Sequence, residues 1–172
     1  MNSPKIENIY HEYTELIGFF RDNSQISFEN YINDTYKKSL LLSAASFFEF
    51  VVTSIIIDYS KSISSNDQKI VAFIQNKALE RQYHTMFEWN ANNANKFFAL
   101  FGDELKAKAR KVIDQKQLFE AERAFIEIGR DRNKLVHNNY IESPINNTFE
   151  EIYSKYNEGC KFLDFLKELV FE

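Results

Sequence analysis

The residues best suited to chemistry lie close together, between positions 129 and 140. Arg130, Asn133 and His137 are three and four positions apart, so a helix places them on one face. Arg132 lies roughly 140° from His137 around the same helix. An imidazole can accept or donate a proton near neutral pH, and a guanidinium can hold an anionic oxygen. The segment therefore combines proton transfer with anion binding.

The rest of the sequence is poor in catalytic signatures. It has no Gly-rich phosphate loop, no His-Glu-x-x-His, no paired cysteines and no Gly-x-Ser-x-Gly. The three histidines lie far apart in the sequence, so we expect no metal and no cofactor. His11 and His84 carry no motif, and we expect ordinary, partly exposed positions for both. The single cysteine, Cys160, cannot form an internal disulfide, and we expect a small buried apolar side chain.

Size and composition favour one helical domain over residues 1–172. Hydrophobic residues make up 44% of the chain, enough to bury a core, while only 4 Gly and 2 Pro favour long helices over many short strands. A formal charge of −4 argues against a high-affinity nucleic-acid scaffold and leaves room for a local basic cleft. Cysteine usage and a polar start over residues 1–8 favour a cytoplasmic protein without a signal peptide.

Hydrophobic periodicity predicts an all-α fold, a helical bundle with two long central helices and several shorter ones. The predicted helices cover residues 4–21, 27–60, 66–86, 94–101, 103–113, 115–138 and 149 onward. Thr148 and Glu151 predict a capping box at the start of the last helix, and Asn138 and Asn139 a stop after the motif helix. The residues expected to face the core in the third helix are Ile70, Phe73, Ile74 and Leu79, and those in the motif helix are Phe119, Ala121, Phe125, Ile128 and Val136.

The apolar stretch Ser39–Ile57 is about long enough to span a bilayer, but Glu49 lies at its centre. A charge at mid-membrane costs on the order of 2.5–3.5 kcal/mol, so we expect the central helix of a bundle and no membrane. Ser46, Glu49 and Thr53 share a face of this helix. A buried carboxylate there needs a cation, and Arg130 or Arg132 could supply it; the carboxylate is then a structural partner or a supporting site residue.

The segment from Arg132 to His137 matches the R-x4-6-H motif of the HEPN superfamily, with the polar Asn133 directly after the arginine. Arg130 satisfies the same motif with six residues before His137. The order of a long apolar helix, a late motif helix and one last helix resembles HEPN bundles over most of the chain. Residues 87–102 resemble the RiboL-PSP or MAE-type HEPN domains.

The resemblance implies a metal-independent endoribonuclease acting as a toxin or an anti-phage effector, with RNA as its substrate. In that setting His137 would transfer protons at the 2′-hydroxyl or the leaving oxygen, Arg132 would bind the phosphate and Asn133 would support them. Arg130 is a second candidate for the phosphate role. The family pattern also implies a homodimer whose two motifs share one cleft, an isologous contact.

The resemblance leaves a second function open, that of a catalytically inactive binding or partner module. Some HEPN proteins pair with nucleotidyltransferases that neutralise them, so an antitoxin or another protein partner is conceivable. In that group a tyrosine follows the motif histidine by two residues, whereas Tyr140 follows His137 by three. This departure argues against regulation through modification of Tyr140.

Overall fold

The computed structural model describes residues 1–138, 140 and 142–172, and these residues form helices and loops without a β-strand. The predicted all-α fold is therefore confirmed. The elements are α1 (Pro4–Asp22), α2 (Ile26–Ile63), α3 (Gln68–Ile74), the π-helical turn η1 (Gln75–Leu79), α4 (Tyr83–Met86), α5 (Asn95–Ala99), α6 (Asp103–Gln115), α7 (Phe119–His137) and α8 (Phe149–Phe171).

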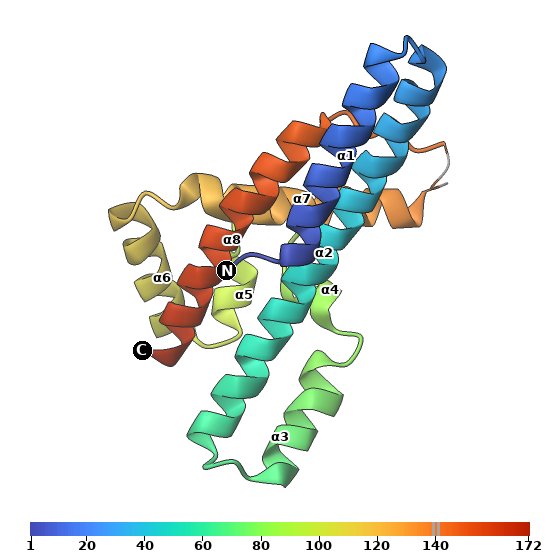
Figure 1. Cartoon of the computed structure of the whole chain (residues 1–172). Helices are drawn as coiled ribbons and strands as arrows, with labels where there is room; N and C mark the ends of the chain where they lie inside the picture. The colour runs from blue at the N-terminus through green and yellow to red at the C-terminus, as the bar shows by residue number, and fades with distance from the viewer. Residues whose placement is uncertain (139, 141) are drawn as a thin grey trace.

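The long helices build the core of the molecule. α1 and α2 form an antiparallel pair, α8 lies along them, and α7 crosses behind and packs on α2 and α8 (Figure 1). Local sequence sets the helix starts: Pro4 occupies the first turn of α1, where its missing N–H costs no hydrogen bond. The predicted capping box opens α8, with the Glu151 N–H donating to Thr148 Oγ1 at 3.1 Å and the Thr148 N–H donating to the Glu151 carboxylate at 2.8 Å.

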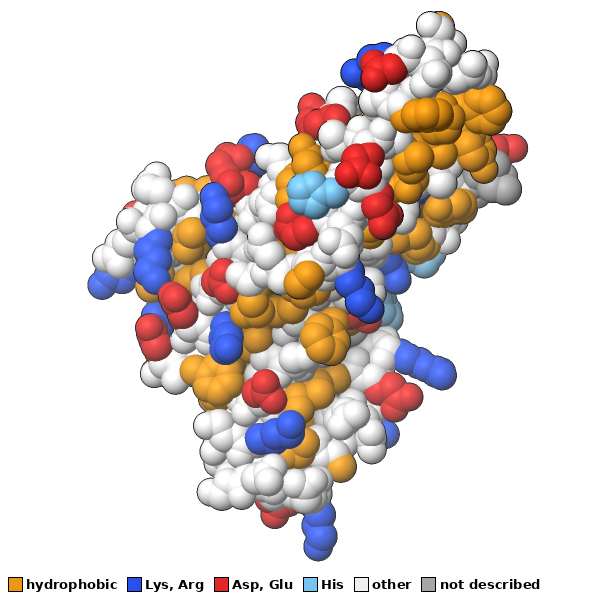
Figure 2. All heavy atoms as spheres, in the orientation of Figure 1, with side chains coloured by type: hydrophobic (Ala, Val, Ile, Leu, Met, Phe, Trp, Pro, Cys, Tyr) orange, Lys and Arg blue, Asp and Glu red, His pale blue; other side chains and the backbone are white. Residues whose placement is uncertain are grey.

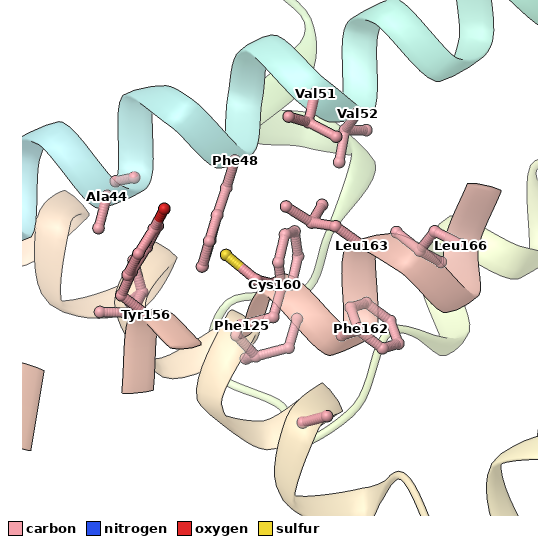
Figure 3. Close-up of a cluster of buried hydrophobic side chains, with 14 of the residues drawn as sticks. Ala44, Phe48, Val51, Val52, Phe125, Tyr156, Cys160, Phe162, Leu163 and Leu166 are labelled. Atoms are coloured by element: carbon pink, nitrogen blue, oxygen red, sulfur yellow. The ribbon is translucent and has the colours of Figure 1, made fainter. Parts of the chain in front are cut away.

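Aromatic rings fill the centre where α2, α7 and α8 meet (Figure 3). Phe48 stacks on Phe125 with ring centroids 5.2 Å apart and on Tyr156 at 6.0 Å. Gly159 allows this approach, because a Cβ there would lie 2.4 Å from Phe48 Cζ. Cys160 is buried in the same cluster, as predicted. Full burial of one such large side chain stabilises the fold by about 1.5–3 kcal/mol, so these contacts hold α7 firmly against its neighbours.

The predicted third helix over residues 66–86 is wrong, because the chain forms three short pieces there. Asp67 caps α3, its carboxylate accepting from the backbone N–H groups of Lys69 and Ile70. The helix widens into η1 and stops at Glu80, and Arg81 adopts a left-handed backbone with φ of 58°. This turn redirects the chain into α4, a feature that side-chain periodicity does not report.

Two predicted core faces also need correction. Ile70 and Phe73 of α3 are 47% and 66% exposed, and the neighbouring Val71 is buried instead, because α3 packs on α2 through one narrow side. On α7, Phe119 and Val136 are 47% and 43% exposed. These positions lie at the two ends of α7, beyond the aromatic cluster that covers the middle of the helix.

α7 ends where the sequence predicts. Asn138 follows its last residue as the C-cap, and the other proposed terminator, Asn139, lies outside the described residues. The motif therefore occupies the last two turns of α7, with His137 as the final helical residue.

By length and composition alone, α2 could cross a membrane. This is weak evidence, since core helices of soluble proteins meet the same criteria. α2 packs against α1, α3, α7 and α8 in this structure, and the buried Lys38 forms an ion pair with Asp34 at 2.8 Å within it. Exposed hydrophobic side chains gather where α1 turns into α2 (Figure 2), among them Phe19, Ile26 and Phe28.

Candidate active site

The motif residues meet in a hollow between α2, α4 and the end of α7. We call it the Glu49 hollow; its volume is about 230 Å³, and it is lined by Glu49 of α2 and by Arg132, Asn133 and His137 of α7. The helical spacing separates Arg132 from His137, but both side chains reach this space from one helix end. Four of the five predicted site residues are thus brought together.

Arg132 is half-buried in this hollow, and its Nη1 donates to Asn133 Oδ1 at 3.1 Å. The ion pairs formed by the described residues of this region involve Arg130 and Lys155, and none of them involves the Arg132 guanidinium. Asn133 therefore orients the guanidinium without neutralising it. A guanidinium held in this way can bind a phosphate oxygen through its remaining N–H donors.

Arg130 lies in a neighbouring hollow of about 600 Å³, the Arg130 hollow, which also contains Asn133 and His137. The Arg130 guanidinium faces two carboxylates, Glu127 at 3.7 Å and Asp131 at 3.9 Å. The structure thus places Arg130 beside His137, as the helix spacing predicts, but outside the Glu49 hollow. Its charge is largely balanced by its own helix.

Glu49 is half-buried, not fully buried as its central position suggests. In the described part of the chain, Glu49 forms no ion pair within 4 Å with Arg130 or Arg132, although the sequence led us to expect one. The charges of Glu49 and Arg132 both act on the Tyr83 hydroxyl of α4. Burial raises the pKa of the Tyr83 hydroxyl well above its usual range, the Glu49 carboxylate raises it further and the Arg132 guanidinium lowers it. Tyr83 therefore stays a neutral hydrogen-bonding group beside the two charges.

The segment from Arg81 to Trp89 forms the wall of the hollow opposite α7, and sequence reasoning missed it. The Trp89 indole packs directly on Gly129: a Cβ there would lie 2.0 Å from Trp89 Cζ3. Its Nε1 donates to the His84 carbonyl oxygen at 2.8 Å. The one sequence signal for this contact is Gly129 itself, an unfavourable residue in mid-helix unless another group approaches closely.

The two hollows are locally basic in a chain of net charge −4. Acidic and basic side chains intermingle over the face shown in Figure 2. The cations that line the two hollows are Arg81, Lys96, Arg130, Arg132 and Lys134, and the carboxylates are Glu49 and Glu88. Arg130 and Lys134 form ion pairs with Glu127 and Asp131 of their own helix. The positive charge that attracts an anionic ligand to this place therefore comes mainly from Arg81, Lys96 and Arg132.

The described residues hold no cluster of three His, Cys, Asp or Glu side chains arranged for a metal ion. The chemistry available from the side chains themselves is proton transfer by imidazoles, hydrogen bonding by Asn133 and Tyr83, and anion binding by arginine.

Comparison with known proteins gives one match. Neither the search of curated proteins nor the search of solved structures found a similar protein. The family description RiboL-PSP-HEPN matches residues 7–172, a span that includes α1 from Glu7 onward, every later helix and both hollows. With the predicted motif on its expected helix and the all-α bundle around it, the chain belongs to the RiboL-PSP-HEPN family.

Proposed function

We propose that the protein is a metal-independent endoribonuclease whose active site is the Glu49 hollow. The observation that carries the proposal is the meeting of Arg132, Asn133 and His137 in one basic hollow. Membership of a HEPN family supports it, since an arginine and a histidine at this spacing are the family motif.

The reaction needs no group beyond RNA itself and these side chains. The 2′-hydroxyl of the RNA attacks the adjacent phosphorus, and the bond from phosphorus to the 5′-oxygen breaks. His137 transfers a proton in this step, and Arg132 binds the phosphate and stabilises the charge that it gains in the transition state. Asn133 Oδ1 accepts a hydrogen bond from Arg132 Nη1 at 3.1 Å and so orients the guanidinium. Glu49 and Tyr83 line the opposite side of the hollow.

The functional unit of this proposal is a homodimer in which two motif helices face one another. Exposed apolar side chains adjoin the site residues in the chain: Phe50, 67% exposed, follows Glu49, and Val136, 43% exposed, precedes His137. Exposed large apolar side chains close in the chain to a polar site are candidates for contact with another protein. An isologous contact over this surface would bring the two basic hollows together.

Cleavage of RNA by purified protein in EDTA tests the proposal. Wild type is expected to cleave, and His137→Ala to be slower by roughly 10²–10⁴-fold, the usual contribution of a general acid or base. His11→Ala is the matched control, because His11 is an exposed histidine on α1, away from both hollows. Equal cleavage by wild type and His137→Ala contradicts the assignment. A stable dimer without any cleavage favours the alternative, an inactive binding module.

The cellular role of such an activity is that of a toxin or an anti-phage effector in the cytoplasm. Induced expression of the wild-type chain is then expected to arrest growth, with loss of intact cellular RNA, while His137→Ala is tolerated. Growth arrest by both chains would separate toxicity from RNA cleavage and remove support for this role.

A further inference from the structure

His84 is the unassigned group closest to the chemistry. The Glu49 hollow and the Arg130 hollow share four residues, His84, Trp89, Asn133 and His137. His84 comes from α4 and His137 from α7, so two imidazoles on different elements border the same openings. A ligand that spans the two hollows passes both rings.

The backbone of His84 is held in place while its ring is free. The Trp89 indole N–H donates to the His84 carbonyl oxygen at 2.8 Å, and Trp89 is fixed against Gly129. Met86 and Phe87, just after His84, are buried at 5% and 2% exposure, whereas His84 is exposed. The anchored neighbours fix the backbone from which the exposed imidazole extends, so only the rotation of the side chain remains to be lost when a ligand binds.

The surroundings of His84 suit an anionic ligand. The charged groups that face it across the hollows are Glu49 of α2, Arg81, Glu88, Lys96 of α5, and Arg130, Arg132 and Lys134 of α7. Arg130 and Lys134 are compensated by carboxylates of α7, and the other three cations attract a phosphate backbone toward the space between His84 and His137. His84 therefore borders the same space as His137, within reach of an anionic ligand that spans the two hollows.

We propose that His84 is the second proton-transfer group of this site, paired with His137 of the same chain; this rests on the proposed ribonuclease function. One imidazole removes the proton of the 2′-hydroxyl as its oxygen bonds to phosphorus. The other, protonated, gives its proton to the 5′-oxygen as the bond from phosphorus to that oxygen breaks. The products are a 2′,3′-cyclic phosphate and a 5′-hydroxyl, and the two rings end with exchanged protonation states that water restores.

A sulfur-substituted RNA separates the two roles. The probe is a short RNA whose cleavage site by wild type has been mapped, made once with oxygen and once with sulfur at the bridging 5′ position of that site. A thiolate leaves without being protonated, so the substitution replaces the need for the general acid. His84→Ala and His137→Ala are each expected to slow cleavage of the oxygen substrate by roughly 10²-fold or more. On the sulfur substrate, one variant regains a rate close to wild type and the other does not.

The controls keep the two proposals apart. His84→Gln repeats the test with a side chain of similar size, and His11→Ala should match wild type on both substrates. If His137→Ala abolishes cleavage while both His84 variants cleave the oxygen substrate at the wild-type rate, the role of His84 is overturned and the ribonuclease stands. If sulfur rescues neither variant, the pairing is also overturned. If wild type cleaves no RNA, both proposals fall together.

Discussion

At the scale of single residues, the two arginines of the motif differ in their surroundings rather than in their spacing. Both precede His137 by an allowed distance, and the sequence leaves the phosphate role open between them. In the structure Arg132 is oriented by Asn133 and faces no carboxylate at close range in the described residues, whereas Arg130 has Glu127 and Asp131 beside it. A guanidinium that is already neutralised gains less from a phosphate than one that is not.

Arginine replacements test this difference. Arg132→Ala is expected to lower kcat for RNA cleavage by about 10²–10³-fold, the usual loss when one transition-state donor is removed. Arg130→Ala is expected to cost roughly tenfold or less, through weaker attraction of RNA. Arg132→Lys should not restore the rate, since an ammonium lacks the planar fork. Steady-state rates on one mapped RNA decide the matter, and a larger loss in Arg130→Ala would reverse the assignment.

Cys160 gives a prediction about stability and pH. Burial raises the pKa of its thiol from the ordinary 9.0 to about 11, and a hydrogen bond from Tyr156 lowers it by less. Above pH 9 the unfolded chain releases this proton while the folded chain retains it, so stability is full below pH 9 and is lost as the pH rises toward 11. The slope is at most about 1.4 kcal/mol per pH unit.

Urea unfolding at intervals between pH 8 and 10 measures this loss. The loss of stability between pH 9 and 10 is assigned to Cys160. The tyrosines with raised pKa values have an ordinary pKa of 10.0, so their ionisation in the unfolded chain lowers the stability mainly at higher pH. Cys160→Ala should show a flatter dependence over that window than wild type. Equal slopes for the two proteins would mean that the thiol ionises equally in both states.

At the scale of elements, the segment between η1 and α5 is the part that sequence reasoning did not place. α1 and α8, which have clear apolar periodicity, and α2, which is apolar on most sides, lie within a few residues of their predicted bounds. The chain from Gln75 to Trp89 consists of a π-helical turn, a left-handed residue at Arg81 and a single helical turn. Its conformation depends on the contact of Trp89 with Gly129 of α7. His84, Tyr83 and Trp89 were therefore missed although the motif on α7 was found.

Gly129 links this segment to the motif helix and gives a prediction. Gly129→Ala places a methyl group where Trp89 lies, so Trp89 must move and release the His84 carbonyl. The expected cost is about 1–3 kcal/mol of stability from overpacking, with a fall in RNA cleavage larger than stability explains. Urea unfolding and cleavage rates are measured on the same preparations.

Gly18→Ala is the matched control. Gly18 also lies within a helix, α1, but a Cβ there meets nothing within 4 Å. This change is expected to stabilise the protein by roughly 0.5–1 kcal/mol with no effect on cleavage. If both glycine variants behave alike, Trp89 does not depend on the space that Gly129 leaves.

At the scale of the whole molecule, the proposed homodimer makes a prediction about the surface near the site. The proposed dimer has a mass of twice 20.4 kDa. Phe50→Glu puts a charge on the exposed apolar side chain that follows Glu49 in α2. It is expected to shift the protein toward monomer and to lower cleavage by tenfold or more, on the order of one lost interface anchor. Sedimentation at micromolar concentration gives the mass.

Phe119→Glu controls for the added charge, because Phe119 is a similarly exposed phenylalanine at the opposite end of α7 from His137. It should leave both mass and cleavage as in wild type. A wild-type protein that sediments as a monomer and still cleaves RNA would show that one hollow, with its two histidines, suffices.

The end groups of the cut RNA are the most direct test of the chemistry proposed for the Glu49 hollow. A mapped RNA is cleaved by wild-type protein in EDTA, and both products are identified by mass. Attack by the 2′-hydroxyl predicts a 2′,3′-cyclic phosphate on one product and a 5′-hydroxyl on the other, with neither formed at a comparable rate by His137→Ala. A 5′-phosphate with a 3′-hydroxyl, or the same products at the same rate from His137→Ala, would contradict it.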